Sequence, residues 1–186
     1  MAPPPPTRLF VGLELPTPVR ADLAELAARV AAAAGGHAVP ARNLHLTVDF
    51  VGALPPSKVR PLAAAVTAAL AGPPIPLRPR ALRARPRPAA ARLVALEFDD
   101  VHGLLAPRAV AVRAAVDALT GPRPDARPLW PHVTLVRLPR PAPVHALPDP
   151  ALAPVVLVRG ALLDSRRVHG GPPEYREVAA VDLRAA

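Results

Sequence analysis

The chain has 186 residues, a formal net charge of +9 and 51% apolar residues. That length suits one domain with a sizeable core, and the apolar content excludes a disordered chain. Cysteine is absent, which excludes disulfides and thiolate metal sites and is compatible with the cytoplasmic location that we expect. No segment reaches the ~20 apolar residues that span a bilayer. The N-terminal proline run also differs from a signal peptide, so we expect neither a leader nor a membrane partner.

The positive charge comes almost entirely from arginine, because the chain has one lysine, Lys58. A basic chain suits a nucleic-acid partner. An excess of arginine, alanine and proline is also typical of proteins from GC-rich genomes, so both interpretations of the charge stay open. The only asparagine, Asn43, runs against that bias and stands two residues before a histidine.

In chain order, we expect a disordered proline-rich tail over residues 1–6 and one domain over 7–186. A strand is expected at 7–15, where apolar residues alternate. Thr17-Pro18 then begins a helix that ends before Gly35-Gly36. The remaining elements expected in the first half are a strand at 43–52, a helix at 56–71, an edge strand at 75–85 and a strand at 92–98.

The second half repeats the same kinds of element. A helix is expected at about 102–120, with Pro107 tolerable only in an early turn. The strands expected after it lie at 131–138 and near 154–163 and 174–183. Hairpin-like pairs within this order indicate antiparallel sheets with helices outside, an α+β fold rather than a Rossmann fold. GxGxxG and Walker loops are absent from the sequence, and we expect no cofactor.

Two segments, 43–48 and 130–135, are close copies of each other. Each places a histidine and a threonine two residues apart in an apolar run that favours a strand, as His45-Leu46-Thr47 and as His132-Val133-Thr134. Side chains at i and i+2 share one face of a strand. Each segment therefore offers an imidazole and a hydroxyl on one face and apolar side chains on the other.

These groups suit acid–base cleavage of a phosphodiester. Histidine titrates near neutral pH, so one histidine can accept a proton while the other donates one. Threonine hydroxyls are uncharged donors that can hold phosphate oxygens. A single histidine on a strand is more often structural, but the repetition 87 residues later favours a paired role.

Three other sets of residues are weaker candidates for the functional site. Arg137 ends the second motif and could hold phosphate in a bidentate manner, although strict alternation would point it away from His132, so it needs a bulge or a strand end. Trp130 and Phe50 could stack on a base, but such aromatic side chains more often belong to the core. The remaining histidines are expected at the surface; they are His37, His102, His145 and His169.

The sequence resembles the 2H phosphoesterases, which carry two HxT/S motifs, and among them the RNA 2′,3′-cyclic phosphodiesterases once called 2′-5′ RNA ligases. The resemblance is carried by the segments 8–16, 43–52 and 127–137, and by Ser165 and Tyr175 near the C-terminal end. It covers nearly the whole chain. The 76–90 segment, rich in proline and arginine, and the 139–150 loop depart from the family pattern.

The resemblance implies two pseudo-symmetric lobes, each a small antiparallel sheet with outer helices, around a central V-shaped cleft. It implies hydrolysis of a 2′,3′-cyclic phosphate RNA end to a 2′-phosphate, with His45 as the acid and His132 as the base. We expect Thr47, Thr134 and Arg137 to bind the substrate, with no metal and with the protein as a monomer.

Alternatives to this function stay open. The same site could act on 2′-5′-linked or small cyclic nucleotides, or run the reverse ligation. A nucleotide-binding module without catalysis is another interpretation, although both histidines and both threonines are intact. A metal held by the two histidines is conceivable, but Asp49 is the only acid near either motif.

Overall fold

The computed structural model describes residues 8–123, 128–166 and 171–185 of the chain. The tail expected at 1–6 lies outside these residues. Three α-helices and nine strands are found within the described part. The helices are α1 (Thr17–Ala34), α2 (Pro56–Leu70) and α3 (Leu105–Thr120). The strands are β1 (Arg8–Glu14), β2 (His37–Ala38), β3 (His45–Ala53), β4 (Ile75–Arg85), β5 (Ala91–Asp99), β6 (His132–Ala142), β7 (Val155–Leu157), β8 (Arg159–Arg166) and β9 (Glu174–Asp182).

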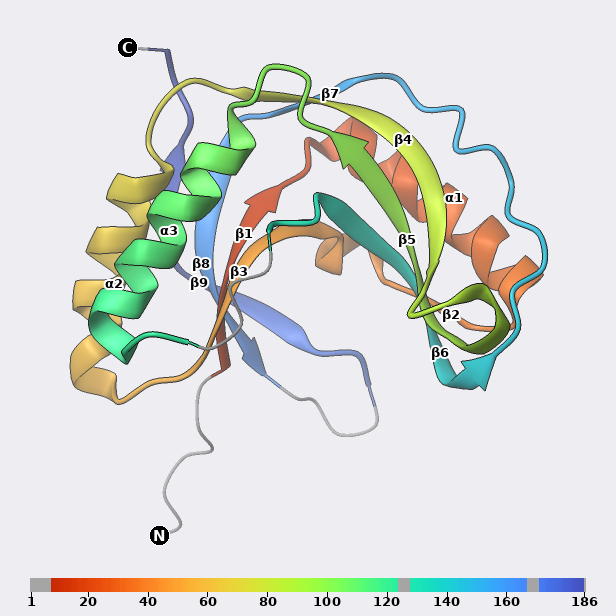
Figure 1. The fold of residues 1–186 in the computed structure, drawn as a ribbon, viewed down its shortest axis with the longest axis horizontal. Coiled ribbons are helices and arrows are strands. Elements are labelled where there is room, and N and C mark those ends of the chain that lie inside the picture. The colour runs from red at the N-terminus through yellow and green to blue at the C-terminus, as the bar shows by residue number, and fades with distance from the viewer. Residues whose placement is uncertain (1–7, 124–127, 167–170, 186) are drawn as a thin grey trace, which may run out of the picture.

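The strands form one curled antiparallel sheet in the order β7-β4-β5-β6-β3-β1-β8-β9, with β2 added beside β6 (Figure 1). The α+β class and the antiparallel pairing are therefore as expected. The two halves are β3-β1-β8-β9 and β6-β5-β4-β7, and they are mirrored in order about the β3–β6 boundary. They are halves of one sheet rather than two separate sheets. Leu46 and Val133 are the paired positions that join them.

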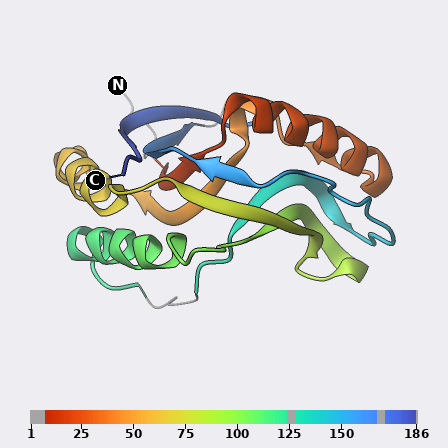
Figure 2. The ribbon, with the colours of Figure 1, turned by 90° about the horizontal axis from the view of Figure 1, so that it is seen from above.

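The helices divide between the two halves (Figure 2). α1 packs against β6, whereas α2 and α3 pack against each other and against β8, β9 and β3. α1 comes from the first half of the chain but covers the β6 half of the sheet. Leu23, Leu26 and Val30 repeat at helical spacing on its buried face. Gly35 ends the helix at φ 70°, and its N–H binds the carbonyl of Ala31 at 2.9 Å.

Two expected strands differ from the structure. The strand expected near 154–163 is two strands, because β7 pairs with β4 and β8 pairs with β1. The strand expected at an edge, β4, is covered by β7 along its first three residues, Ile75–Leu77. From Arg78 to Arg85 it pairs with β5. Pro76 and Pro79 fit this position, since proline cannot donate to a ladder and is confined to edges and bulges.

Candidate active site

His45 begins β3 and His132 begins β6, so the two motifs lie on the two central, adjacent strands. Leu46 pairs with Val133, and both side chains are buried in the core. Because the strands are antiparallel, the flanking positions place His45 across from Thr134 and Thr47 across from His132. These four polar side chains are only partly buried. The structure thus brings the two predicted motifs together on the open face of the sheet.

Each histidine is held in the same tautomer by the backbone two residues before it. Nδ1 of His45 lies 2.7 Å from the carbonyl oxygen of Asn43, and Nδ1 of His132 lies 2.7 Å from that of Trp130. A carbonyl only accepts, so Nδ1 carries the proton in both rings. Nε2 is therefore the unprotonated nitrogen of each neutral ring and is available to accept a proton. On the His45 side, Nε2 lies 3.0 Å from Oγ1 of Thr47.

The His45 ring contacts two aromatic side chains, and the residue that orients it is itself held by a hydrogen bond. Phe10 lies 4.9 Å from it between ring centroids, and Tyr175 meets it edge-on at 5.2 Å. Buried Asn43 donates its side-chain amide to the carbonyl of Pro173 at 2.7 Å. This bond anchors the loop before β9 to the residue whose carbonyl orients His45. It also gives the lone asparagine of the sequence a structural role.

The environment of the His132 ring is different. Trp130 stacks on it at 3.8 Å between centroids with an interplanar angle of 17°. The guanidinium carbon of Arg85 lies 4.4 Å from the centroid of the Trp130 ring and forms a cation–π contact with it. The indole N–H donates to Glu97 at 2.7 Å. Trp130 is therefore engaged by neighbouring side chains, whereas Phe50 is 70% exposed on the open face.

Burial lowers the pKa of both histidines below the ordinary value. For His45, burial is opposed by the hydrogen bond to Asn43 and assisted by the charges of Arg137 and His132. For His132, burial is opposed by the bond to Trp130 and by Glu97, and assisted by Arg85 and Arg137. Both rings are thus biased toward the neutral form until an anion arrives.

Arg137 reaches the open face because β6 contains a bulge. Thr134 pairs with Ala95 and Val136 with Val94, so Leu135 is an extra residue in β6. Leu135 and Val136 are both buried, and Arg137 then points to the same side as His132 and Thr134. Under strict alternation Arg137 would point away from His132, so a bulge was needed to bring it to the same face, and the structure contains one. The charge of Arg137 acts on His45, His132 and Tyr175.

β3 contains the matching bulge. Gly12 pairs with Thr47 and Val11 with Asp49, so Val48 is the extra residue. Phe50 consequently occupies the position in β3 that Arg137 occupies in β6. The two halves of the site share one backbone plan but present an apolar side chain on one side and a cation on the other.

A pair of carboxylates that was not predicted from the sequence follows the same symmetry. Glu14 pairs with His45 across β1 and β3, and Glu97 pairs with His132 across β5 and β6. The signal was an internal repeat, because Val11-Gly12-Leu13-Glu14 resembles Val94-Ala95-Leu96-Glu97. Each glutamate is held by an arginine from the next strand outward, Arg159 at 3.2 Å and Arg83 at 2.9 Å.

Other polar residues near the motifs are already engaged. Asp49 is buried and forms a bidentate ion pair with Arg123, with contacts of 3.1 and 2.7 Å. It is therefore committed to a guanidinium rather than open to a metal. Within residues 8–123, 128–166 and 171–185, histidines and carboxylates form no cluster of three or more that could hold a metal ion. His37, His102 and His145 are exposed, as expected, and His169 lies outside the described residues.

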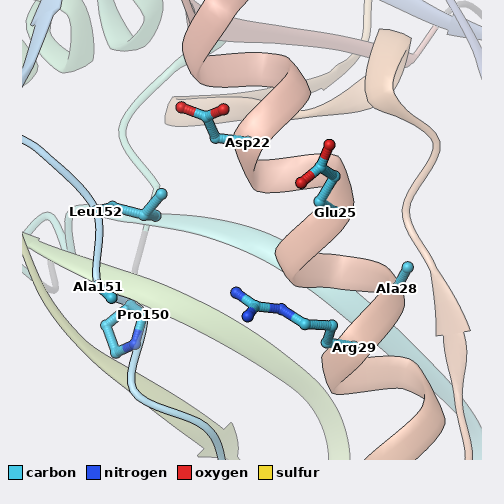
Figure 3. Close-up of a pocket in the computed structure, with 7 residues that line it drawn as sticks. All are labelled: Asp22, Glu25, Ala28, Arg29, Pro150, Ala151 and Leu152. Atoms are coloured by element: carbon cyan, nitrogen blue, oxygen red, sulfur yellow. The ribbon is translucent and has the colours of Figure 1, made fainter.

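Two of the surface hollows formed by the described residues are relevant to locating the site. The smaller, about 190 Å³, adjoins His45 and is lined also by Arg20, Arg42 and Tyr175. The larger, about 540 Å³, lies between α1 and residues 150–152, away from both motifs. Figure 3 shows Arg29 extending from α1 toward Ala151 and Pro150, with Asp22 and Glu25 on the same helix. Charged side chains on one helix face are typical of a solvated surface, so this hollow contains none of the expected chemistry.

Comparison with known proteins agrees with this geometry. Residues 13–89 match the family model described as LigT like phosphoesterase. TT0787 of Thermus thermophilus is 29% identical with a TM-score of 0.82, over 96% of this chain and 98% of that one. E. coli LigT is 24% identical in apo form and 23% identical in complex with 3′-AMP, both with a TM-score of 0.79. These alignments cover 96% of this chain and 98% and 99% of LigT. No curated protein matches the chain significantly.

The curled antiparallel sheet and its paired HxT strands define a two-histidine phosphoesterase fold. The fold matches that of the LigT-like 2H phosphoesterases, and residues 13–89 match their family model. No helix among the described residues is long and apolar enough to cross a membrane.

Proposed function

We propose that this protein is an RNA 2′,3′-cyclic phosphodiesterase that opens the terminal cyclic phosphate to a 2′-phosphate. The observation that carries the proposal is the pair of histidines on adjacent strands. Each donates its Nδ1–H to a backbone carbonyl, so Nε2 is the nitrogen that can exchange a proton with the substrate. A phosphate held between them has a proton acceptor on one side and a proton donor on the other. The 3′-AMP complex of E. coli LigT supports a nucleotide ligand for such a site.

In the proposed reaction, Nε2 of His132 accepts a proton from water as the water oxygen attacks phosphorus. The bond from phosphorus to the 3′ oxygen breaks, and Nε2 of protonated His45 gives its proton to that oxygen. The product is a 2′-phosphate monoester and a free 3′ hydroxyl. His132 then loses its proton to solvent and His45 regains one. The roles of acid and base follow the family resemblance.

Three side chains are proposed to hold the phosphate oxygens. Thr47 and Thr134 supply hydroxyl donors, and Arg137 supplies a cation from the bulge of β6. Exposed Phe50 offers an aromatic face to the terminal base. The proposal includes a monomer in the cytoplasm, one bilobal domain over 7–186 and no metal requirement.

A direct assay tests the reaction class. Purified protein is incubated with a nucleoside 2′,3′-cyclic phosphate, with and without EDTA, and the product is identified as the 2′- or 3′-phosphate. We expect the 2′-phosphate at an equal rate in both reactions. Activity lost in EDTA and restored by a divalent ion contradicts the proposed metal-free mechanism. Turnover restricted to 2′-5′-linked dinucleotides favours the alternative substrate instead.

Removing either histidine tests the mechanism. His45→Ala and His132→Ala should each lower kcat by at least ~10²-fold, the scale of one general acid or base. The double variant should lose less than the product of the single losses, because the two groups act as a unit. Circular dichroism checks that the variants fold. Near-normal turnover by either single variant would show that the paired roles are wrong.

A further inference from the structure

The two halves of the site have the same backbone plan but opposite chemistry. Arg83 pairs with Ala95 and Arg85 with Leu93, just as Ala161 pairs with Gly12 and Leu163 with Phe10. Three positions on the His132 side therefore carry cations where the His45 side carries apolar groups. The cations are Arg83, Arg85 and Arg137, and their counterparts are Ala161, Leu163 and Phe50.

The arginines of β4 continue along the strand as one row. We define the β4 arginine row as Arg78, Arg80, Arg83 and Arg85. Arg78 pairs with Asp99, and Asp99 lies on the same face of β5 as Glu97. Arg80 is the extra residue of a bulge in β4. Because of this bulge, Arg83 and Arg85 also lie on the face that carries Glu97. The row therefore shares the face of the sheet that carries His132. Its strand, β4, is separated from β6 by β5 and lies on the side away from β3 (Figure 1).

The β4 arginine row has more positive charge than its neighbours neutralise. Arg78 and Arg80 share Asp99 at 3.3 and 3.7 Å, while Arg83 and Arg85 share Glu97 at 2.9 and 3.7 Å. Four guanidinium groups thus face two carboxylates. The arginine side chains stay between 47% and 64% exposed. Because the side chains are this exposed, an anion in solution can reach them.

We propose that the β4 arginine row binds the phosphodiester backbone of a single-stranded RNA, on the 5′ side of the reacting end. The inference rests on the proposed function and names the substrate class of that site as an oligonucleotide rather than a mononucleotide. A row of separated guanidinium groups matches a polyanion with repeated phosphates better than one phosphate, which Arg137 and the threonines can hold. Guanidinium is also the group best suited to bidentate phosphate contacts.

The asymmetry also orients the bound strand. The terminal base would lie toward exposed Phe50 on the apolar side, and the upstream phosphates toward β4.

The test compares two substrates with the same reacting end. One is uridine 2′,3′-cyclic phosphate, and the other is a short single-stranded RNA that ends in the same group. We expect kcat/KM of the wild type to be higher for the RNA and to fall steeply with salt. The variant R78Q/R80Q should lose roughly two- to fivefold per arginine on the RNA, the scale of exposed ion pairs. Its salt slope should flatten by about 1.4, at about 0.7 per phosphate contact.

Arg78 and Arg80 are chosen because both pair with Asp99, away from both histidines. Hydrolysis of the cyclic mononucleotide by R78Q/R80Q should therefore match the wild type. Arg60→Gln, an exposed arginine on α2, is the matched control and should change neither substrate. Equal kcat/KM for both substrates in the wild type, or an unchanged ratio in R78Q/R80Q, would overturn the proposal.

Binding separates this proposal from the proposed reaction. Fluorescence anisotropy with a labelled RNA ending in a 3′-phosphate needs no turnover. Weaker binding by R78Q/R80Q than by Arg60→Gln supports the row even if the cyclic substrate is never cleaved. Equal binding by the two variants counts against it.

Discussion

Two histidines in near-identical sequence motifs have different surroundings in the folded protein. His45 is enclosed by Phe10 and Tyr175, whereas His132 lies under Trp130 and within the fields of Arg85 and Glu97. Identical groups that share a site need different environments if one is to act as acid and the other as base. The asymmetry that the motifs lack is therefore supplied by residues outside them.

The pKa shifts give a prediction for the pH dependence of activity. If one histidine must be neutral and the other protonated, kcat/KM traces a bell against pH that reports the free enzyme. Burial lowers both pKa values from ~6.5, so the optimum of that bell should lie on the acidic side of ~6.5. An anionic phosphate stabilises imidazolium, so the bell for kcat should lie at higher pH.

The pH profiles of kcat/KM and kcat are measured from initial rates at fixed ionic strength. The acidic and basic limbs of each bell are assigned to the coupled pair of histidines rather than to either one alone. A flat kcat/KM profile between pH 5 and 9, with chemistry rate-limiting, favours the interpretation as a binding module.

The threonines provide a second prediction at this scale. Thr47→Val and Thr134→Val each remove a hydroxyl donor at nearly constant shape. A hydrogen bond to a charged group contributes about 1.5–3 kcal/mol, so kcat/KM should fall roughly 10- to 150-fold. The pH midpoints should move little, because the Thr47 hydroxyl can donate to neutral Nε2 or accept from its protonated form. An unchanged kcat/KM would remove the threonines from the phosphate site.

The secondary-structure elements were largely predictable because their apolar spacing is regular. Helical spacing located α1 and α2, and alternation located β1, β3 and β5. A bulge depends on how a strand registers against its partner, which local sequence does not show. The extra residues Val48 and Leu135 therefore leave no mark in the apolar pattern. For that reason the orientation of Arg137 needed the structure. The repeat that contains Glu14 and Glu97 was present in the sequence, but its meaning depended on knowing which strands are neighbours.

Gly36 offers a test of the bulge in β6. A Cβ at this position would lie 2.6 Å from Cγ1 of Val136 and 2.9 Å from the backbone oxygen of Arg137. Gly36→Ala must therefore displace β6 where Arg137 is aimed, and overpacking of this kind costs about 1–3 kcal/mol. We expect a lower urea midpoint and a reduced kcat/KM with both histidines intact. Gly171→Ala, which meets no atom within 4 Å, is the matched control. Wild-type activity and stability in Gly36→Ala would show that the bulge tolerates displacement.

At the scale of the whole molecule, local pattern could not predict how the strands divide between the halves of the sheet. β7 and β8 are separated only by Val158, yet β7 joins β4 in one half and β8 joins β1 in the other. One apolar run thus crosses from one half to the other, although alternation alone predicts a single strand. α1 likewise covers the half of the sheet built mainly from later residues. The strand crossing and the position of α1 have one reason: both halves of the sheet share a core, and each half needs helices packed on it to bury its apolar face.

Arg123 connects distant parts of the chain and supports the last prediction. It follows α3, contacts Asp117 at 2.6 Å, and binds both carboxylate oxygens of Asp49 and the carbonyl of Phe50 on β3. Arg123→Met would leave buried Asp49 without its cation, which typically costs about 3 kcal/mol. Urea unfolding should show that loss, and Asp49→Asn in the same chain should recover part of it, giving a non-additive cycle. Arg184→Met, which breaks an exposed pair with Asp182, should change the free energy of unfolding by less than about 1 kcal/mol. If Arg123→Met is no less stable than Arg184→Met, this ion pair does not fasten α3 to the central strand.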